Sequence, residues 1–278
     1  YVYNRLLSLN EVGTGPLRFG IELDEFHAFN LHRMSCWPHA MNATATHDTK
    51  RGEDVRARLN VLSEMPDEWE CRLWEWHEIN LSRKIQIGNR AAPENDDEYL
   101  LYQTLLGAYP FDRTEYPTFI ERIKAYLIKA AREAKVHTNW LEPNSQYEEA
   151  LLTFADRVVE LGTDNPFMPS FLPFQRRIQH HGILNSLSQT LLKLTVPGMP
   201  DFYQGTELWD LSLVDPDNRR PVDFERRSAL LELLKGSAGG NLLSLIAELL
   251  AAPEDGRIKL FLIYRALLAR RAELELFQ

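Results

Sequence analysis

A run of ionisable and hydroxyl side chains, Thr46-His47-Asp48-Thr49-Lys50-Arg51, is the sharpest candidate site in the sequence. It follows a short stretch of small and β-branched residues and precedes a predicted helix that begins near residues 52–54. A carboxylate beside an imidazole and two cations can bind hydroxyl groups, stabilise a developing positive charge or hold a metal ion. The same residues also fit a helix N-terminus with an Asp cap and a solvated Lys-Arg pair, so local chemistry leaves both interpretations open.

Two further polar loops lie downstream. The segment 197–207 contains two prolines and two glycines, which shape a loop with unusual backbone angles, and it carries Asp201 and Glu207. A rigid turn with a buried structural glutamate explains this segment as well as ligand contact does. The segment 215–221 suits hydroxyl-rich ligands, and it equally suits a loop held by Asx turns. Its candidate binding side chains are Asp215, Asp217 and Arg219.

The elements that must position these loops are mostly helical. Apolar residues recur at helical spacing through most of the chain. Helices are predicted over 22–33, 54–62, 67–85, 95–106, 118–136, 144–161, 171–194, 224–234, 242–250 and 258–274. Short strands are predicted only at 42–46 and 195–196, and a polar loop closely follows each. Polar clusters at strand ends are typical of the edge of a parallel α/β barrel that carries the active site.

Composition excludes several classes of function. The chain has 278 residues, with 31 Lys and Arg against 40 Asp and Glu, and this net charge of −9 argues against nucleic acid or an anionic membrane as the main partner. Cys36 and Cys71 alone cannot make a disulfide framework or a four-thiolate zinc site. No apolar run is long enough to span a bilayer and no signal peptide is evident, so we expect a cytoplasmic protein. Phosphate-cradling glycine loops, zinc-protease motifs and nucleophile elbows do not occur, and we expect neither a cofactor nor a metal.

Five stretches, in this order and at this spacing, resemble the maltooligosyl trehalose synthases, a family of the α-amylase superfamily. The most specific is 46–58, Thr-His-Asp-Thr-Lys-Arg-Gly-Glu-Asp-Val-Arg-Ala-Arg, whereas a bare His-Asp pair would carry little weight. The resemblance spans nearly the whole chain. The stretches that carry it are 4–13, 46–58, 132–138, 197–207 and 213–221.

The resemblance implies a mainly α fold, in which a helical insertion domain accompanies the last strands and helices of a (β/α)8 barrel. Residues 1–65 would end the barrel with its seventh strand (Thr44 to Asp48, including the loop), 66–167 would form the helical insertion, and 168–278 would hold the eighth strand with its loop (Thr195 to Glu207) and the following helices. The chain also begins without Met inside a predicted helix over 2–9 and stops just after another. We therefore expect a C-terminal-half fragment that lacks the family's last β domain.

The resemblance also implies chemistry. Enzymes of this family convert the reducing-end α-1,4 bond of a maltooligosaccharide into an α,α-1,1 trehalose bond, through a glycosyl-enzyme intermediate typical of retaining glycosidases. Asp48 matches the third acidic residue of the superfamily and would favour the oxocarbenium-like transition state. His47 would hydrogen-bond the same sugar, and Lys50 would retain the leaving glucose. Arg51 would support the loop and is also a substrate-binding candidate, as are Asp215, Asp217 and Arg219.

One departure from the family pattern matters for activity. The nucleophilic Asp and the acid-base Glu of the superfamily lie upstream of the third Asp, and neither motif occurs before Asp48 here. We therefore predict that this chain alone is inactive. Two alternatives stay open: a helical His-Asp metal phosphohydrolase, which would need His27, His180 or His181 as further ligands, and a non-catalytic helical module that binds glucan.

Overall fold

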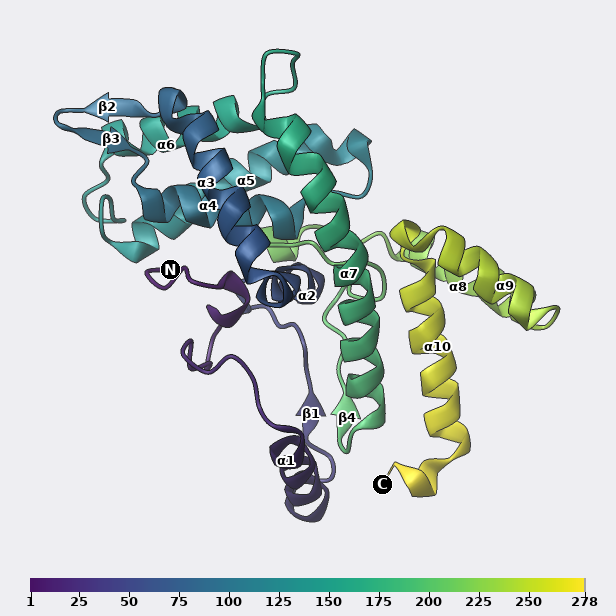
Figure 1. The fold of residues 1–278 in the computed structure, drawn as a ribbon. Coiled ribbons are helices and arrows are strands. Elements are labelled where there is room, and N and C mark those ends of the chain that lie inside the picture. The colour runs from purple at the N-terminus through teal and green to yellow at the C-terminus, as the bar shows by residue number, and fades with distance from the viewer. Residues whose placement is uncertain (278) are drawn as a thin grey trace. The chain divides into compact units, whose positions relative to one another are not determined.

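The computed structural model describes residues 1–277 and is mainly α-helical, as the sequence predicts (Figure 1). The α-helices are α1 (Leu23–Cys36), α2 (Glu53–Asn60), α3 (Pro66–Asn80), α4 (Asn95–Ala108), α5 (Tyr116–Ala134), α6 (Ser145–Val159), α7 (Phe167–Thr195), α8 (Phe224–Ala238), α9 (Leu242–Ala251) and α10 (Arg257–Ala272). The strands are β1 (Met41–Asn42), β2 (Ile85–Ile87), β3 (Arg90–Ala92) and β4 (Met199–Pro200). No helix within residues 1–277 is both long and apolar enough to cross a membrane.

The chain divides into two compact units. The first unit combines Tyr1–Glu11 with Val55–Gly182, and the second combines Val12–Asp54 with the chain from Ile183 onward. The assignment of 1–65, 66–167 and 168–278 to parts of a barrel and an insertion stays a prediction. The candidate loops of the sequence all lie in the second unit.

An aromatic cluster forms the centre of the first unit. Trp76 on α3 is completely buried, and its indole nitrogen donates a 3.0 Å hydrogen bond to Ser170 on α7. Its ring meets Tyr102 on α4 edge-on at 5.6 Å between centroids and Phe167 at 5.3 Å. Offset and edge-on ring contacts of this kind add to the large apolar area that aromatic side chains bury. Two tryptophans of the 67–85 segment, Trp69 and Trp76, thus serve as packing anchors, whereas Trp74 is exposed.

The first unit also contains a hairpin that the sequence did not predict. The helix expected over 67–85 ends at Asn80, a short 3-10 turn follows at Leu81–Arg83, and β2 pairs with β3 antiparallel in the register Ile85 with Ala92. Gly88 in the turn has a φ of 62°, which a residue without Cβ adopts at low cost. Ile85 and Ile87 pack against buried Ala92, so tertiary burial overrides the helical periodicity.

The second unit contains a short parallel strand pair close to the two positions where the sequence predicts strands. β1 and β4 are parallel: Met199 N donates to Ala40 O and Asp201 N donates to Asn42 O, each at 2.9 Å. The strand predicted over 195–196 is wrong, because Thr195 still belongs to α7 and the strand forms after the Pro197-Gly198 turn. The strand predicted over 42–46 is likewise confined to Met41–Asn42.

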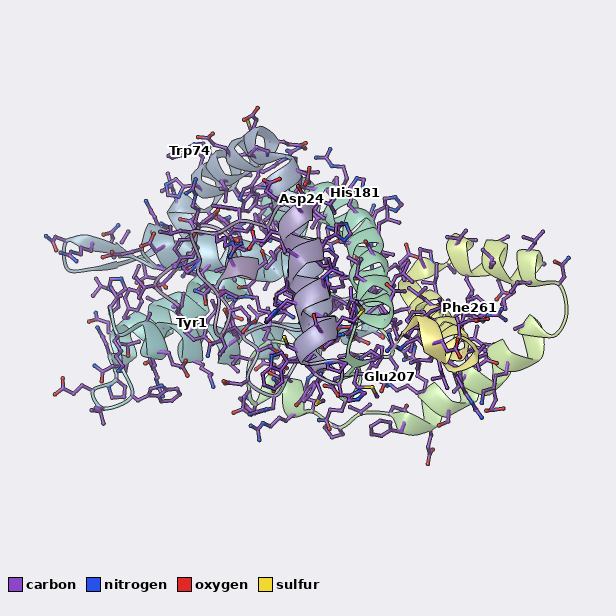
Figure 2. All side chains as sticks on the ribbon, turned by 90° about the horizontal axis from the view of Figure 1, so that it is seen from below. Tyr1, Asp24, Trp74, His181, Glu207 and Phe261 are labelled. Atoms are coloured by element: carbon purple, nitrogen blue, oxygen red, sulfur yellow. The ribbon has the colours of Figure 1, made fainter. Side chains whose placement is uncertain are left out.

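The helices α8, α9 and α10 enclose a second apolar cluster. Leu234, Leu249 and Phe261 lie at its centre, and Figure 2 labels Phe261. Two of these helices begin at side-chain caps, where Asp223 accepts from Arg226 N at 2.8 Å and Asn241 accepts from Ser244 N at 3.1 Å. Such caps satisfy amide groups that a helix start would otherwise leave unpaired.

Candidate functional site

The His47–Asp48 loop follows β1 and is held by a short turn. Thr49 N donates to Thr46 O at 3.4 Å, Thr46 N donates to Thr49 Oγ1 at 3.3 Å, and Asp48 N donates to Thr46 Oγ1 at 3.2 Å. The side chains of His47 and Asp48 are exposed within this unit, and Lys50 is half-buried. The loop therefore presents an imidazole and a carboxylate from a fixed backbone.

The loop is joined to the segment that carries the third cluster. Arg51 is fully buried and forms an antiparallel β-bridge with Leu213, and Gly52 N donates to Ser212 O at 2.8 Å. A Cβ at Gly52 would lie 2.7 Å from the carbonyl oxygen of Asp210, so only glycine permits this close approach. The Arg51 side chain is thus buried, unlike those of His47 and Asp48, and it is not exposed for direct contact with a substrate.

Asn218 makes the second connection between the two segments. Its side-chain nitrogen donates a 3.0 Å hydrogen bond to the carbonyl oxygen of His47, and the residue itself is buried. Sequence reasoning included Asn218 only within a motif, without assigning it a role. The bond positions the backbone directly before Asp48.

The remaining predicted substrate-binding residues, Asp215, Asp217 and Arg219, form ion pairs and hydrogen bonds within their own loop. Asp215 Oδ1 lies 2.5 Å from Arg219 Nε, and both side chains are substantially exposed. Asp217 accepts from Leu213 N at 2.7 Å and pairs with Arg220 Nε at 3.0 Å. The structure therefore favours a loop-holding role for Asp217, whereas Asp215 and Arg219 remain at the surface.

The segment 197–207 is mainly a rigid turn. Gly198 has a φ of 115°, and a Cβ there would lie 2.5 Å from Ala40 O. Glu207 pairs with Arg227 Nε at 3.1 Å, and the same guanidinium donates to Gly205 O at 2.8 Å. These contacts fit a structural role for Glu207 in holding the turn.

A buried charge cluster lies directly behind the start of α2. Lys259 on α10 is completely buried, and its Nζ lies 2.7 Å from Glu53 Oε1 and 2.8 Å from Asp54 Oδ2. Lys193 on α7 donates to Thr44 Oγ1 at 2.8 Å and lies 3.4 Å from Glu53 Oε2. The cluster ties both ends of the 44–54 segment, which contains His47 and Asp48, to α7 and α10.

The pKa values in this cluster follow from burial and close charges. Burial alone would raise the pKa of Glu53, but the ammonium groups of Lys259 and Lys193 outweigh it and lower that pKa to about 2. Burial raises the pKa of Asp54, and Lys259 opposes this only in part. For Lys259, burial would lower the pKa, but the carboxylates of Asp54 and Glu53 raise it overall. Glu53 and Lys259 therefore form a fully charged pair at neutral pH.

Sequence reasoning missed this cluster because its partners are far apart in the chain. Glu53 and Asp54 read as ordinary acidic residues of a first helical turn, which the helix dipole favours. The one available signal was Lys259, a single cation within the apolar run 258–263.

The alternative of a metal phosphohydrolase would need a set of metal ligands. Nowhere in residues 1–277 do three or more His, Cys, Asp or Glu side chains gather to hold a metal.

Comparisons with known proteins agree with the resemblance seen in the sequence. No protein-family model matches the chain. Over 232 residues, or 83% of the chain, it is 41% identical to a Mycobacterium tuberculosis protein (strain H37Rv) whose assigned name is maltooligosyl trehalose synthase. The chain spans 28% of the length of this relative.

Solved structures give the same result. A crystal structure of a maltooligosyl trehalose synthase is 39% identical with a TM-score of 0.84, and the match covers 99% of this chain and 35% of that one. The maltooligosyltrehalose synthase of Arthrobacter ramosus is 38% identical with a TM-score of 0.82, over 99% of this chain and 32% of its own. Sequence identity near 40% over most of the chain, together with matching folds, places this chain in the maltooligosyl trehalose synthase family.

Proposed function

We propose that the chain supplies part of an intramolecular transglucosylase that converts the reducing-end α-1,4 bond of a maltooligosaccharide into an α,α-1,1 trehalose bond. The observation that carries the proposal is the exposed His47–Asp48 pair at the end of the parallel β1–β4 pair, on a loop tied to buried Asn218. This is the placement expected of a catalytic loop in a barrel enzyme.

Each residue of the loop has a chemical role in this proposal. The carboxylate of Asp48 accepts hydrogen bonds from hydroxyls of the distorted sugar and favours its positively charged transition state. His47 hydrogen-bonds the same sugar, and Lys50 holds the released glucose until its anomeric hydroxyl attacks. Arg51, which is buried, supports the loop.

The second loop would extend the substrate site. The exposed pair Asp215 and Arg219 offers an acceptor and several donors to sugar hydroxyls. Asp217 acts there through the backbone, because its carboxylate accepts from Leu213 N. Asn218 is a positioning residue that fixes the carbonyl group of His47.

A reducing-end assay on maltopentaose tests the proposal. We expect loss of reducing ends with a version extended to the length of the relatives, and no turnover by the 278-residue chain, in which neither the nucleophile motif nor the acid-base motif precedes Asp48. Asp48→Asn should abolish the activity of the extended protein. The matched control is Asp24→Asn, since Asp24 is an exposed carboxylate on α1. Retained activity in Asp48→Asn, or turnover by the 278-residue chain, would contradict the assignment.

A further inference from the structure

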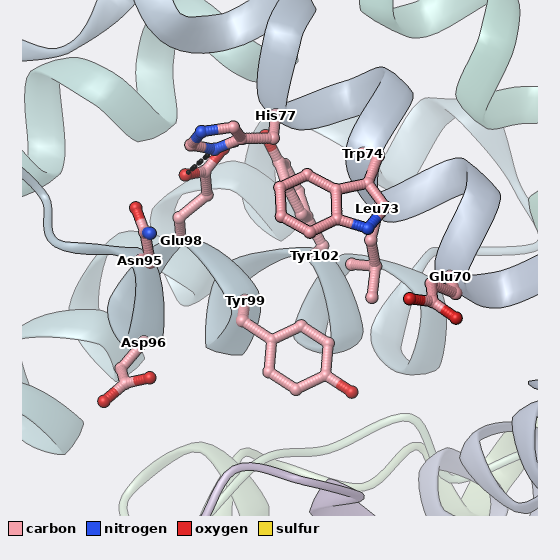
Figure 3. A pocket seen from close by; sticks show the side chains of 9 residues that line it. All are labelled: Glu70, Leu73, Trp74, His77, Asn95, Asp96, Glu98, Tyr99 and Tyr102. Atoms are coloured by element: carbon pink, nitrogen blue, oxygen red, sulfur yellow. Dashed lines mark hydrogen bonds and ion pairs between the residues drawn. The ribbon is translucent and has the colours of Figure 1, made fainter.

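A pocket of about 360 Å³ lies between α3 and α4 in the first unit, and none of the residues discussed above for the transglucosylase reaction lines it (Figure 3). Its volume lies within the range of about 300–1,000 Å³ typical of small-molecule sites. The side of α3 that faces it carries Glu70, Trp74 and His77, which are four and three residues apart and therefore share one helical face. The facing residues on α4 include Asp96 and Tyr99.

Aromatic rings provide the apolar walls. Trp74 is 63% exposed although it is the largest type of side chain, and its indole nitrogen has no hydrogen-bond partner among residues 1–277. Its ring meets His77 edge-on at 6.2 Å between centroids. Tyr99 is fixed from behind, because its hydroxyl donates to Arg5 O at 2.8 Å and its ring stacks on Trp69. An exposed indole held beside an anchored phenol is a ready stacking surface.

Hydrogen-bonding groups surround these rings. The carboxylates of Glu70 and Asp96 are exposed, and in the described part of the chain neither makes a hydrogen bond or ion pair. His77 Nδ1 lies 2.9 Å from Glu98, as the dashed line in Figure 3 marks. Because a carboxylate only accepts, His77 Nδ1 is the donor in this contact.

The floor of the pocket is rigid before any ligand binds. Glu98 is buried and accepts from Tyr102 Oη at 2.6 Å and from Lys84 Nζ at 2.7 Å, so its charge is already compensated. Asn80 Nδ2 donates to the same Tyr102 hydroxyl at 2.8 Å. A preformed site of this kind loses little conformational entropy on binding.

We propose that this pocket binds a stretch of maltooligosaccharide. A pyranose ring has an apolar C–H face that packs on an indole, and its edge carries hydroxyls that donate to carboxylates. Trp74 and Tyr99 can pack against this apolar face. Glu70, Asp96 and His77 can hydrogen-bond the hydroxyls of the edge. The assignment of a glucan, rather than another hydroxyl-rich ligand, rests on the proposed function.

Titration calorimetry of the 278-residue chain with maltoheptaose tests this inference. We expect saturable binding in the millimolar range that Trp74→Ala weakens by about tenfold or more, because the stacking surface is lost. The matched control is Trp140→Ala: Trp140 is 52% exposed in the same unit, stacks on Arg132 and does not line the pocket. Circular dichroism verifies that both variants are folded.

The outcomes separate this inference from the proposed function. Binding that Trp140→Ala leaves unchanged but Trp74→Ala weakens supports the pocket as a glucan site, whatever the reducing-end assay shows. Binding lost in Asp48→Asn but kept in Trp74→Ala overturns it and assigns glucan to the His47–Asp48 loop. Absence of saturable binding overturns it as well. Choline is the probe for a cationic ligand, since rings beside carboxylates also attract cations, and binding of choline without maltoheptaose would refute the sugar assignment.

Discussion

Lys259→Met is the sharpest test of the charge cluster behind the His47–Asp48 loop. The substitution keeps most of the side-chain length but removes the ammonium group that lies 2.7 Å from Glu53 and 2.8 Å from Asp54. Glu53 keeps Lys193 at 3.4 Å as a second cation. The nearest remaining donor to Asp54 is the backbone amide of Asp210 at 2.6 Å. The variant therefore leaves Asp54 as a buried carboxylate without an ion-pair partner.

Removing one partner of a buried ion pair reduces the free energy of unfolding by about 3 to 5 kcal/mol. We expect a loss in this range at pH 7, because Lys259 is fully buried and serves two carboxylates. The loss should be smaller at pH 5. Burial already raises the pKa of Asp54, and without Lys259 the pKa rises further, so a proton can neutralise the orphaned group at a cost of about 1.4 kcal/mol per pH unit.

Urea denaturation at pH 7 and pH 5, followed by circular dichroism, measures both effects. Lys235→Met is the matched control, since Lys235 makes an exposed pair with Glu232 at 2.7 Å and its removal should change stability little. Adding Asp54→Asn to Lys259→Met should recover part of the loss. A Lys259→Met variant as stable as the control, or equally destabilised at both pH values, would refute the reasoning.

Three further outcomes follow from the structure. Trp76→Ala should lower the free energy of unfolding by about 3 to 5 kcal/mol in urea denaturation, because a fully buried indole and its bond to Ser170 are lost. Gly198→Ala should lower the thermal midpoint, since its Cβ would lie 2.5 Å from Ala40 O at a φ of 115°; an unchanged midpoint would contradict this. Because the pKa of Glu53 is lowered, its stabilising contribution is complete above pH 4.5 and is lost as the pH falls towards about 2. In Glu53→Gln, the free energy of unfolding should therefore depend less on pH in that window.

Local patterns predicted the helices well because helix formation depends on near neighbours. The helix predicted over 144–161 is α6, and it begins at a cap: the Asn144 side chain accepts from Tyr147 N at 3.2 Å. The amphipathic stretch predicted over 118–136 forms α5 and buries Phe119, Ile123 and Leu127. Most predicted helix ends lie within four residues of the observed ones. The helix predicted over 67–85 is an exception, because it ends at Asn80, and the helix predicted over 2–9 is wrong, because only a 3-10 turn forms there at Leu7–Leu9.

Strand positions were predicted less well because strands depend on distant partners. The helical period continued through 67–85, yet Ile85 and Ile87 form a hairpin that packs on Tyr147 and Ala150 of α6. The parallel β1–β4 pair joins Met41 to Met199 across most of the chain. A two-residue strand is too short to show the alternation of apolar and polar residues that marks longer strands, so the sequence does not reveal this pairing.

The sequence by itself determined the mainly α character and, through the specific stretch 46–58, the family resemblance. It also identified His47 and Asp48 as candidates, because this identification depends only on residue types and their order along the chain. Only the tertiary structure decided that Arg51 is buried and that Asn218 holds the carbonyl group of His47. It alone revealed Lys259 between Glu53 and Asp54. Burial and pairing of charges arise from contacts between residues up to 206 positions apart, and no local pattern encodes those contacts.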